Sequence, residues 1–529
     1  MRGTYIRGVV MKESKNVRRV ITVVIMILFS CTVCNGDKIN FNVIREPAVA
    51  GQFYSNDADV LEQGINDFIA DALPGFSQKP VAIITPHAGY IYSGQICADA
   101  FKQAMGHNYD LVVILGINHT VPGFNRVSVY RGDGYRTPLG IAEIDTGLAE
   151  ALAACDSRFA FYPSVHVREH SVEVQLPFVQ SLFPGVRVIT AVIGVSDPKL
   201  CRDFGLALAE KIKDRRTLIV ASSDLSHYPS YDDARDVDRH TLEAIQTLDT
   251  TRFQRVIKEQ MSRKISNLST CACGEGAILA AMEAAKALGG TDAHIISYAN
   301  SGDVAVGNRS RVVGYGAVAI WKTPLEGVPG PFETNETPML QTPMSDREHR
   351  VLLDFARRNI ERYLTTQILP LTRGFDSSFY ANRGAFVTIR KHGSLRGCIG
   401  HMAWDTPLIS VVGGMAFQAA FQDRRFPPLS RDEMSDVELE ISVLTPCSLV
   451  DGAGDIVTGR DGVMIHKNGR SAVYLPQVAP EQRWDVIETL EHLCQKAGLA
   501  KDAWKEGAEL YTFQAEVFSE GEYLKQLDH

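Results

Sequence analysis

Six short apolar segments constrain the fold of the first 320 residues more strongly than any other feature. They lie at 81–85, 110–116, 186–194, 217–222, 294–299 and 312–321. Segments with helical periodicity separate them, among them 198–214 and 274–289. A strand without polar alternation is buried on both faces, which is typical of parallel strands covered by helices. We therefore expect an α/β domain at 45–322, with a largely parallel sheet and helices on both faces.

A second, smaller domain is expected after a proline-rich linker at 323–344. Five prolines in this segment argue against a helix or a central strand: Pro324, Pro329, Pro331, Pro338 and Pro343. Ser345 and Glu348 then form a capping-box pattern ahead of apolar residues at helical spacing. Strand patterns cluster further on, at 384–393, 437–446 and 462–476. This clustering predicts an α+β domain with antiparallel hairpins over residues 345–529.

The first 36 residues predict a signal or anchor segment. Basic side chains at Lys12, Lys15, Arg18 and Arg19 precede an apolar run at 20–34. This run is shorter than the roughly 20 residues that a membrane span needs, and a polar segment follows it. We expect export or membrane attachment, with Cys31 or Cys34 as candidate lipidation sites. A cytoplasmic location is the alternative.

Composition narrows the function. The net charge of -8 provides no basic footprint, so we expect no binding to nucleic acid. Of the 10 cysteines, two lie in the leader and the others are scattered through a long chain. Such scattering is not a disulfide framework, although an exported protein would tolerate one.

Side chains that can bind metal follow three of the apolar segments directly. These residues are His87, His119 and the pair Asp224 and His227. The carboxyl ends of parallel strands meet at one edge of a sheet, where ligands bind. One histidine at a strand end is commonly structural, but three such ends together favour a shared site. Two imidazoles and an anionic ligand suit iron, copper or zinc.

Two further segments could complete the site. Cys271 and Cys273 precede the helix expected at 274–289, and the positive end of its dipole would lower the pKa of a thiol. A thiolate is the form that binds metal, whereas a protonated cysteine packs as a small apolar residue. Glu169 and His170 are expected either to close over the pocket or to serve as capping or surface residues.

A family resemblance adds specific partners. "TPHAGYIYSG", "GINH", "REHSVEVQLPF", "SSDLSHY", "CACGEGA" and "SYANSGD" occur in the order typical of the Memo family. That family resembles the class III extradiol dioxygenases in fold, and the resemblance covers nearly all of 45–322. It implies a metal held by His87, His119 and Cys273, and two histidines with a thiolate make iron or copper the expected ion. The dioxygenases carry a carboxylate as third ligand, so the thiolate departs from the ring-cleaving pattern. Asp224 and His227 match the family's further pocket residues. On chemical grounds we expect catalytic roles for them, with His227 as proton shuttle or fourth ligand and Asp224 fixing its tautomer.

The remainder of the chain resembles a second family. "SLRGCIGH", "FQDRRFPPLS" and "GVMIHKNGRSAVYLPQV" look like the AMMECR family, over 346–525. The fusion of the two domains is similar to the AmmeMemoRadiSam system, whose third member resembles a radical S-adenosylmethionine enzyme. This resemblance implies a radical-SAM protein as a partner on another chain.

The AMMECR-like domain has its own candidate site. Gly397 and Gly400 bracket Cys398, which we expect to be a half-exposed thiol beside Arg396. A guanidinium near the thiol would favour the thiolate. The alternative is a turn whose cysteine packs inward. Arg396, Cys398 and His401 are the candidate residues.

Three functions remain open from the sequence. The first is a metal-dependent redox protein, dioxygenase-like, that uses iron or copper and acts with a radical-SAM partner. The second is a non-catalytic module that binds metal or a peptide. The third is a zinc hydrolase, which ranks last because the chain has no "HExxH" motif.

Overall fold

The computed structural model describes residues 43–304, 307–325 and 343–522. The predicted signal segment at 1–36 and most of the predicted linker at 323–344 lie outside these residues. Over the described part of the chain, no helix combines the length and the apolar character that a membrane span requires.

An eight-stranded sheet forms the centre of the first domain. Its strand order is β10-β11-β2-β9-β3-β8-β4-β7. The inner strands β2, β9, β3 and β8 are parallel, whereas β11 is antiparallel to β2 and β10 is antiparallel to β11. All six strands expected from the sequence are present. The strands are β2 (Ala82–Thr85), β3 (Leu111–Ile117), β4 (Val127–Val129), β7 (Phe159–Ala160), β8 (Arg187–Ile193), β9 (Thr217–Ser222), β10 (Asp292–Asn300) and β11 (Gly314–Trp321).

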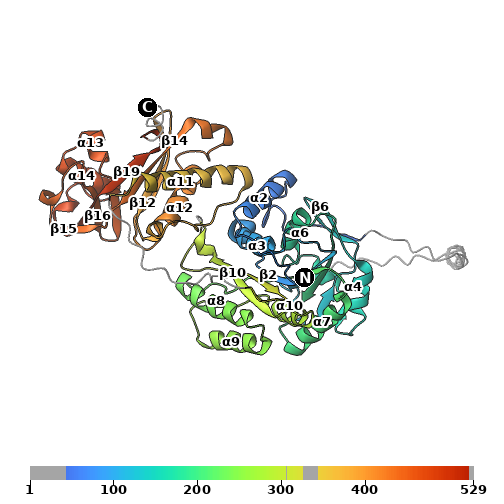
Figure 1. Ribbon diagram of the computed structural model, residues 1–529. Helices are drawn as coiled ribbons and strands as arrows, with labels where there is room; N and C mark the ends of the chain where they lie inside the picture. The colour runs from blue at the N-terminus through green and yellow to red at the C-terminus, as the bar shows by residue number, and fades with distance from the viewer. Residues whose placement is uncertain (1–42, 305–306, 326–342, 523–529) are drawn as a thin grey trace, which may run out of the picture. The chain divides into compact units, whose positions relative to one another are not determined.

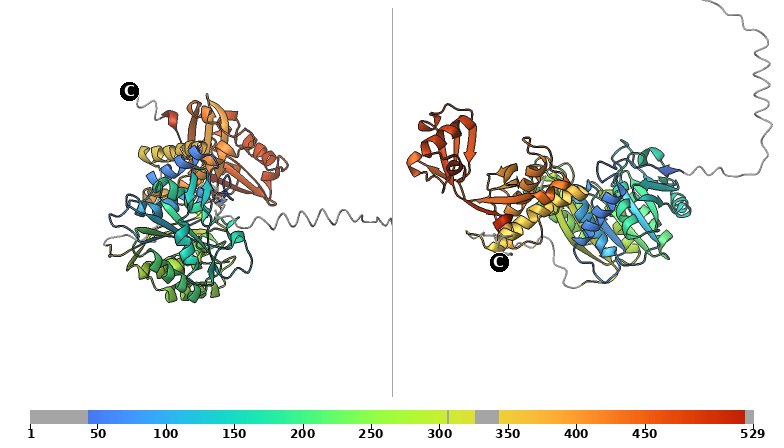
Figure 2. Two further views of the ribbon diagram at one scale, coloured as in Figure 1. Left: turned by 90° about the vertical axis from the view of Figure 1, so that its right-hand side faces the viewer. Right: turned by 90° about the horizontal axis from the view of Figure 1, so that it is seen from above.

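Helices cover both faces of this sheet, as expected (Figures 1 and 2). On one side lie α2 (Ala58–Ala70), α3 (Tyr90–Ala104) and α6 (Leu176–Leu182). On the other lie α7 (Pro198–Ile212), α8 (Tyr231–Gln246) and α10 (Glu275–Ala287), while α9 (Thr250–Ser262) packs beside α8. Because both faces are covered, every residue of β2 and β9 is buried. This burial explains why neither segment shows polar alternation.

Local sequence determines where the helices begin and how closely they pack. Asp197 caps α7 by accepting a hydrogen bond from the Leu200 N–H, with Pro198 at the first helical position. Gly205 lies where α7 crosses α10, and a Cβ atom there would lie 2.5 Å from the Ala280 carbonyl oxygen. The glycine therefore lets the two helices pack in close contact.

A small three-stranded sheet, in the order β1-β5-β6, also belongs to this domain. It consists of β1 (Ile44–Arg45), β5 (Gly134–Thr137) and β6 (Gly140–Glu143). β1 runs parallel to β5 and places Arg45 opposite Tyr135. Arg45 is buried at this position, which matters for the site described below.

The AMMECR-like segment begins as expected and has a different architecture. Helix α11 (Asp346–Thr366) starts at the predicted capping box, in which Ser345 and Glu348 exchange hydrogen bonds. Two four-stranded sheets follow, in the orders β13-β12-β14-β19 and β15-β18-β16-β17, each with its own apolar core. Their strands are β12 (Ala385–Lys391), β13 (Ser394–His401), β14 (Val437–Leu444), β15 (Ser448–Val450), β16 (Gly462–Lys467), β17 (Arg470–Tyr474), β18 (Glu509–Phe513) and β19 (Ala515–Ser519). The helices that accompany them include α12 (Leu408–Phe421) and α14 (Val486–Lys496).

The alternative interpretation of "SLRGCIGH" as a turn was wrong. "SLRGCIGH" is strand β13, paired along its length with β12, and not a turn. Its glycines are needed for close packing. A Cβ atom on Gly397 would lie 2.2 Å from the Ala419 carbonyl oxygen, and one on Gly400 would lie 2.1 Å from the Phe386 ring.

Candidate metal centre

The three strand ends that carry metal-binding side chains lie next to one another. Strands β2, β9 and β3 are adjacent and parallel, so their carboxyl ends reach the same edge of the sheet. His87 follows β2, Asp224 follows β9 and His119 follows β3. The topology therefore brings together residues that are more than 130 positions apart in sequence.

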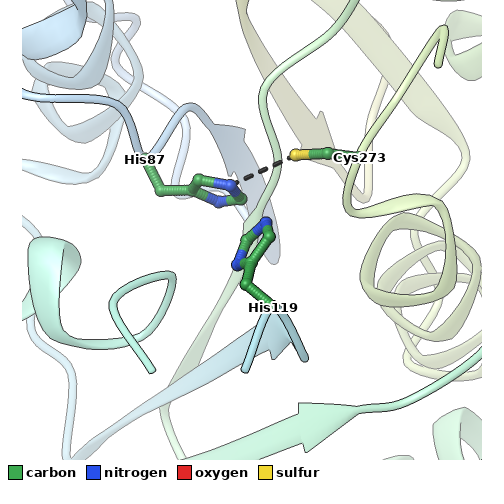
Figure 3. Close-up of side chains that lie close together, drawn as sticks. All are labelled: His87, His119 and Cys273. Atoms are coloured by element: carbon green, nitrogen blue, oxygen red, sulfur yellow. Dashed lines mark hydrogen bonds between the residues drawn. The ribbon is translucent and has the colours of Figure 1, made fainter. Parts of the chain in front are cut away.

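Cys273 joins this group from the loop that precedes α10. One donor atom from each of His87, His119 and Cys273 lies within 4.8 Å of the others. The Cys273 Sγ is 3.2 Å from the His87 Nε2, and Figure 3 shows the three side chains converging from separate elements. The two imidazole rings are nearly perpendicular, with centroids 5.2 Å apart.

The tautomer of His87 is fixed by a buried serine. The His87 Nδ1 lies 3.0 Å from the Ser222 Oγ, and that hydroxyl donates its own hydrogen to the Ser171 carbonyl at 2.6 Å. Ser222 must therefore accept the hydrogen on Nδ1, which leaves a free lone pair on Nε2. Burial lowers the pKa of His87 to about 3, so the ring is neutral at physiological pH.

Glu169 fixes the second histidine in the same way. Its Oε1 accepts a hydrogen bond from the His119 Nδ1 at 2.9 Å, so the His119 Nε2 is also free. Burial alone would raise the pKa of Glu169, but the hydrogen bonds from His119 and from the Ser171 N–H lower it to about 2. Glu169 is thus a buried carboxylate that supports a ligand and does not cover the pocket as a lid.

The expected effect of the helix dipole on Cys273 was wrong. Cys273 lies at the amino-terminal end of α10, yet burial raises the pKa of its thiol well above the ordinary value. Asp224, close by, raises it further. Desolvation outweighs the dipole here because the dipole acts through a partial charge, whereas burial removes most of the hydration of a thiolate. A bound cation would have to displace the thiol proton.

Asp224 and His227 line the same site, but they do not form the pair expected from the sequence. The Asp224 Oδ2 and the His227 Nε2 are 3.9 Å apart, too far for a hydrogen bond. Asp224 instead accepts hydrogen bonds from the main-chain N–H groups of His87 and Ala88, at 2.7 and 3.2 Å. It therefore positions the main chain of a candidate ligand. Burial raises the pKa of Asp224 and lowers the pKa of His227.

The His227 Nε2 is buried and has no hydrogen-bond partner among the described residues. Asp224, His227 and Cys273 form a second set, in which one donor atom from each residue lies within 4.8 Å of the others. A polar atom that is aimed into a site without a partner is available to a metal, a substrate or a proton.

His170 completes the surroundings of His119. Their rings stack with centroids 4.5 Å apart, and Phe53 meets His170 edge-on. Burial lowers the pKa of His170 to about 4, so it too is neutral at physiological pH. His119, Glu169 and His170 form a third donor set, although Glu169 already accepts the hydrogen of His119.

The residues present fit a single metal ion. Ligand bonds of about 2.0–2.3 Å place two ligands of one ion within about 4.5 Å of each other. The spacing of the donor atoms in His87, His119 and Cys273 therefore requires only small shifts. Two imidazoles and a thiolate suit copper, iron or zinc better than calcium or magnesium.

The candidate residues of the AMMECR-like domain are not gathered in the same way. Arg396 binds Glu433 through two hydrogen bonds of 2.9 and 3.0 Å, and His401 binds Asp405 at 2.9 Å. Cys398 and His401 are three positions apart on one strand, so their side chains leave opposite faces. The Cys398 thiol is half-buried and accepts a hydrogen bond from the Thr388 hydroxyl at 3.3 Å.

The sequence did not indicate the groups that orient His87. Ser222 is the last residue of β9, and Gln175 donates to its hydroxyl at 3.0 Å. Neither residue type suggests a site by itself. The one available signal was that a polar residue ends a fully apolar strand.

This geometry defines a class: an α/β domain with candidate metal-binding histidines at the carboxyl ends of its parallel strands and a cysteine from the loop before α10. Residues 45–319 match the family model described as Memo-like protein, and residues 353–518 match the AMMECR1 model. The chain belongs to the Memo family.

Relatives agree with this membership. A MEMO1 family protein of Nitrosopumilus maritimus is 36% identical over 282 residues, which are 52% of this chain and 99% of that protein. One from Aquifex aeolicus is 37% identical over 277 residues, 51% of this chain and 97% of that protein. The solved structure of uncharacterized protein PH0010 from Pyrococcus horikoshii is 37% identical, covering 33% of this chain and 93% of its own, with a TM-score of 0.33.

Proposed function

We propose that the Memo domain is a metal-dependent redox protein that holds one iron or copper ion through His87, His119 and Cys273. One observation carries this proposal: the Nε2 atoms of both imidazoles are free, because Ser222 accepts the Nδ1 hydrogen of His87 and Glu169 accepts that of His119, and the His87 Nε2 lies 3.2 Å from the Cys273 thiol. Metal-binding histidines are oriented in this way by groups that accept their other ring hydrogen.

The donor set favours a redox ion over zinc in a hydrolase. A soft thiolate with two imidazoles suits copper and iron, whereas a hydrolytic zinc site commonly uses histidines and carboxylates. When bound, such an ion would supply electron transfer and an open position for a small molecule. The side chain of His119 is 29% exposed, so the site is accessible from solvent.

Residues around the metal site would transfer protons and position the main chain. The buried, unpartnered Nε2 of His227 can take or give a proton within the site, and burial lowers the pKa of this ring. Asp224 holds the main chain at His87 and Ala88 through its Oδ1. We assign proton transfer to His227 and main-chain positioning to Asp224.

We further propose that the protein acts with a radical-SAM partner and is exported or attached to a membrane. The joining of Memo and AMMECR1 domains in one chain supports the partner. The basic and apolar character of residues 1–36 supports the location.

Metal analysis tests the function. Protein purified without oxygen should contain about one iron or copper per chain, and the double variant His87→Ala/His119→Ala should contain almost none. His240→Ala removes a partly exposed histidine on α8 and should keep the metal. Oxidation and reduction should then change the electron paramagnetic resonance spectrum of the wild type. Stoichiometric metal without any redox change would favour the binding module, and no specific metal at all would reject the proposal.

A further inference from the structure

Glu169 makes more contacts with His119 than a hydrogen-bond acceptor for the ring requires. Its Oε1 accepts the His119 Nδ1–H, and its Oε2 accepts the main-chain N–H of the same residue at 2.6 Å. The Oε1 also accepts the Ser171 N–H at 2.9 Å. The carboxylate, 1% exposed, therefore binds both the ring and the backbone of one candidate ligand.

The loop that carries Glu169 has little regular structure of its own. Between α5 (Pro163–His166) and the short helix η1 (Glu173–Gln175), the chain runs through a turn without strand pairing. Such a segment keeps its shape only if its main-chain polar groups bind elsewhere. The position of the Glu169 carboxylate therefore depends on what holds this loop.

Arg45 holds the loop from the small sheet. Its Nε donates to the His166 carbonyl at 3.1 Å, and its Nη2 donates to the Glu169 carbonyl at 2.6 Å. Its Nη1 forms an ion pair with the Glu173 carboxylate. One planar guanidinium thus contacts three points of the segment 166–173, a geometry that lysine cannot reproduce.

The ion pair is buried on both sides. The side chains of Arg45 and Glu173 are 4% and 0% exposed. Glu173 also accepts hydrogen bonds from the Val49 N–H at 3.0 Å and the Tyr54 hydroxyl at 2.5 Å. A buried pair satisfied this fully keeps a defined geometry and does not shift freely.

We propose that Glu169 and Arg45 are positioning residues of the metal centre: Glu169 holds His119 in the tautomer with a free Nε2, and Arg45 fixes the loop that carries Glu169. The role in metal binding rests on the function proposed above. The role in fixing the tautomer of His119 does not, because the hydrogen bonds exist without metal. Through Arg45, strand β1, which follows the predicted signal segment, thereby helps to position a candidate ligand of the metal centre.

The test measures the tautomer of His119 and the affinity for metal separately, both on the full chain. Nitrogen-15 NMR of histidine-labelled, metal-free protein reports which ring nitrogen carries hydrogen, with His119 assigned through its loss in His119→Asn. We expect the wild type to show hydrogen on Nδ1 only. In Glu169→Ala, the ring should convert to a mixture or to the Nε2–H form.

The second measurement is the affinity of each variant for copper(I) and iron(II), determined by competition with chelators. Glu169→Ala should bind 10- to 100-fold more weakly, the usual effect of losing such a partner. Glu169→Gln keeps the side-chain volume and should also weaken binding, because an amide cannot accept hydrogen from both the ring and the backbone of His119. Arg45→Lys keeps the charge beside Glu173 but loses the planar fork, and we expect a smaller weakening in the same direction.

Glu283→Gln is the matched control, since Glu283 is a buried glutamate on α10 that accepts one hydrogen bond, from Thr250. It should leave tautomer and affinity unchanged. Folded Glu169 variants with the wild-type tautomer and affinity within twofold of wild type would overturn the proposal. If wild type binds no metal but the tautomer still changes in Glu169→Ala, the metal function fails while the positioning of His119 stands.

Discussion

Replacing Ser222 with alanine should damage the centre without touching a ligand. Ser222 is fully buried, and its hydroxyl accepts the Nδ1 hydrogen of His87 at 3.0 Å and donates to the Ser171 carbonyl at 2.6 Å. Gln175, its third contact, keeps another partner because its Nε2 also donates to the Pro86 carbonyl at 2.7 Å. The substitution therefore leaves two buried polar groups without partners.

The magnitude follows from those two groups. An unsatisfied buried donor or acceptor costs about 1–3 kcal/mol, so the loss of partners for both groups should lower the free energy of unfolding by about 2–6 kcal/mol. The His87 ring also loses the group that keeps hydrogen on Nδ1, and a hydrogen on Nε2 would block the metal. Metal affinity should drop about 10- to 100-fold.

Denaturant unfolding and chelator competition measure the two effects. Thr137→Ala is the control: it removes a buried hydroxyl on β5 that bonds to Gln180 at 2.6 Å, away from the candidate ligands. It should lower stability without changing affinity more than about twofold. If Ser222→Ala lost stability yet bound metal as tightly as wild type, the argument that tautomer fixing prepares His87 would be refuted.

Three further predictions concern other parts of the chain. Burial keeps the Cys273 thiol protonated, so metal binding should release about one proton, and the affinity for the metal should rise roughly tenfold per pH unit between about pH 5 and 8. In metal titrations at several pH values, Cys273→Asp should show a weaker dependence of affinity on pH. Burial raises the pKa of Asp238 to about 7, above its unfolded value, so its stabilising contribution is full in acid and is lost as the pH rises through 7. Relative to Asp238→Asn, the wild type should lose up to about 4 kcal/mol of unfolding free energy between pH 4 and 8, and an equal pH dependence in both proteins would show that this carboxyl is ionised throughout. Gly397→Ala should destabilise the AMMECR1 domain by about 1–3 kcal/mol, since the new methyl group would meet the Ala419 carbonyl at 2.2 Å; thermal unfolding should show this loss while metal content stays constant.

The sequence predicted the sheet and the convergence of the strand ends for a physical reason. Strands buried on both faces leave an unbroken apolar pattern, and parallel strands bring their carboxyl ends to one edge. His87, His119 and Asp224 could therefore be grouped before the order β2-β9-β3 was known. The capping box at Ser345 was equally predictable, because it depends on residues only three positions apart.

Features that depend on distant contacts or on burial could not be predicted. The loop that carries Glu169 is bound by Arg45, more than 120 residues earlier, through the carbonyls of Glu169 and His166. Whether desolvation or the helix dipole controls the Cys273 thiol depends on how deeply it is buried, which no local pattern reveals. The glycines beside Cys398 left a turn open as an alternative, but they allow close packing in a strand, and sequence alone does not separate these two uses.

X-ray absorption at the edge of the metal that copurifies with the protein tests the central claim most directly. One ion held by His87, His119 and Cys273 predicts a first shell with one sulfur at about 2.3 Å and two imidazole nitrogens at about 2.0 Å. Cys273→Ser should remove the sulfur contribution and keep the imidazoles. A first shell that contains only oxygen and nitrogen, or a sulfur signal that persists in Cys273→Ser, would contradict the assignment.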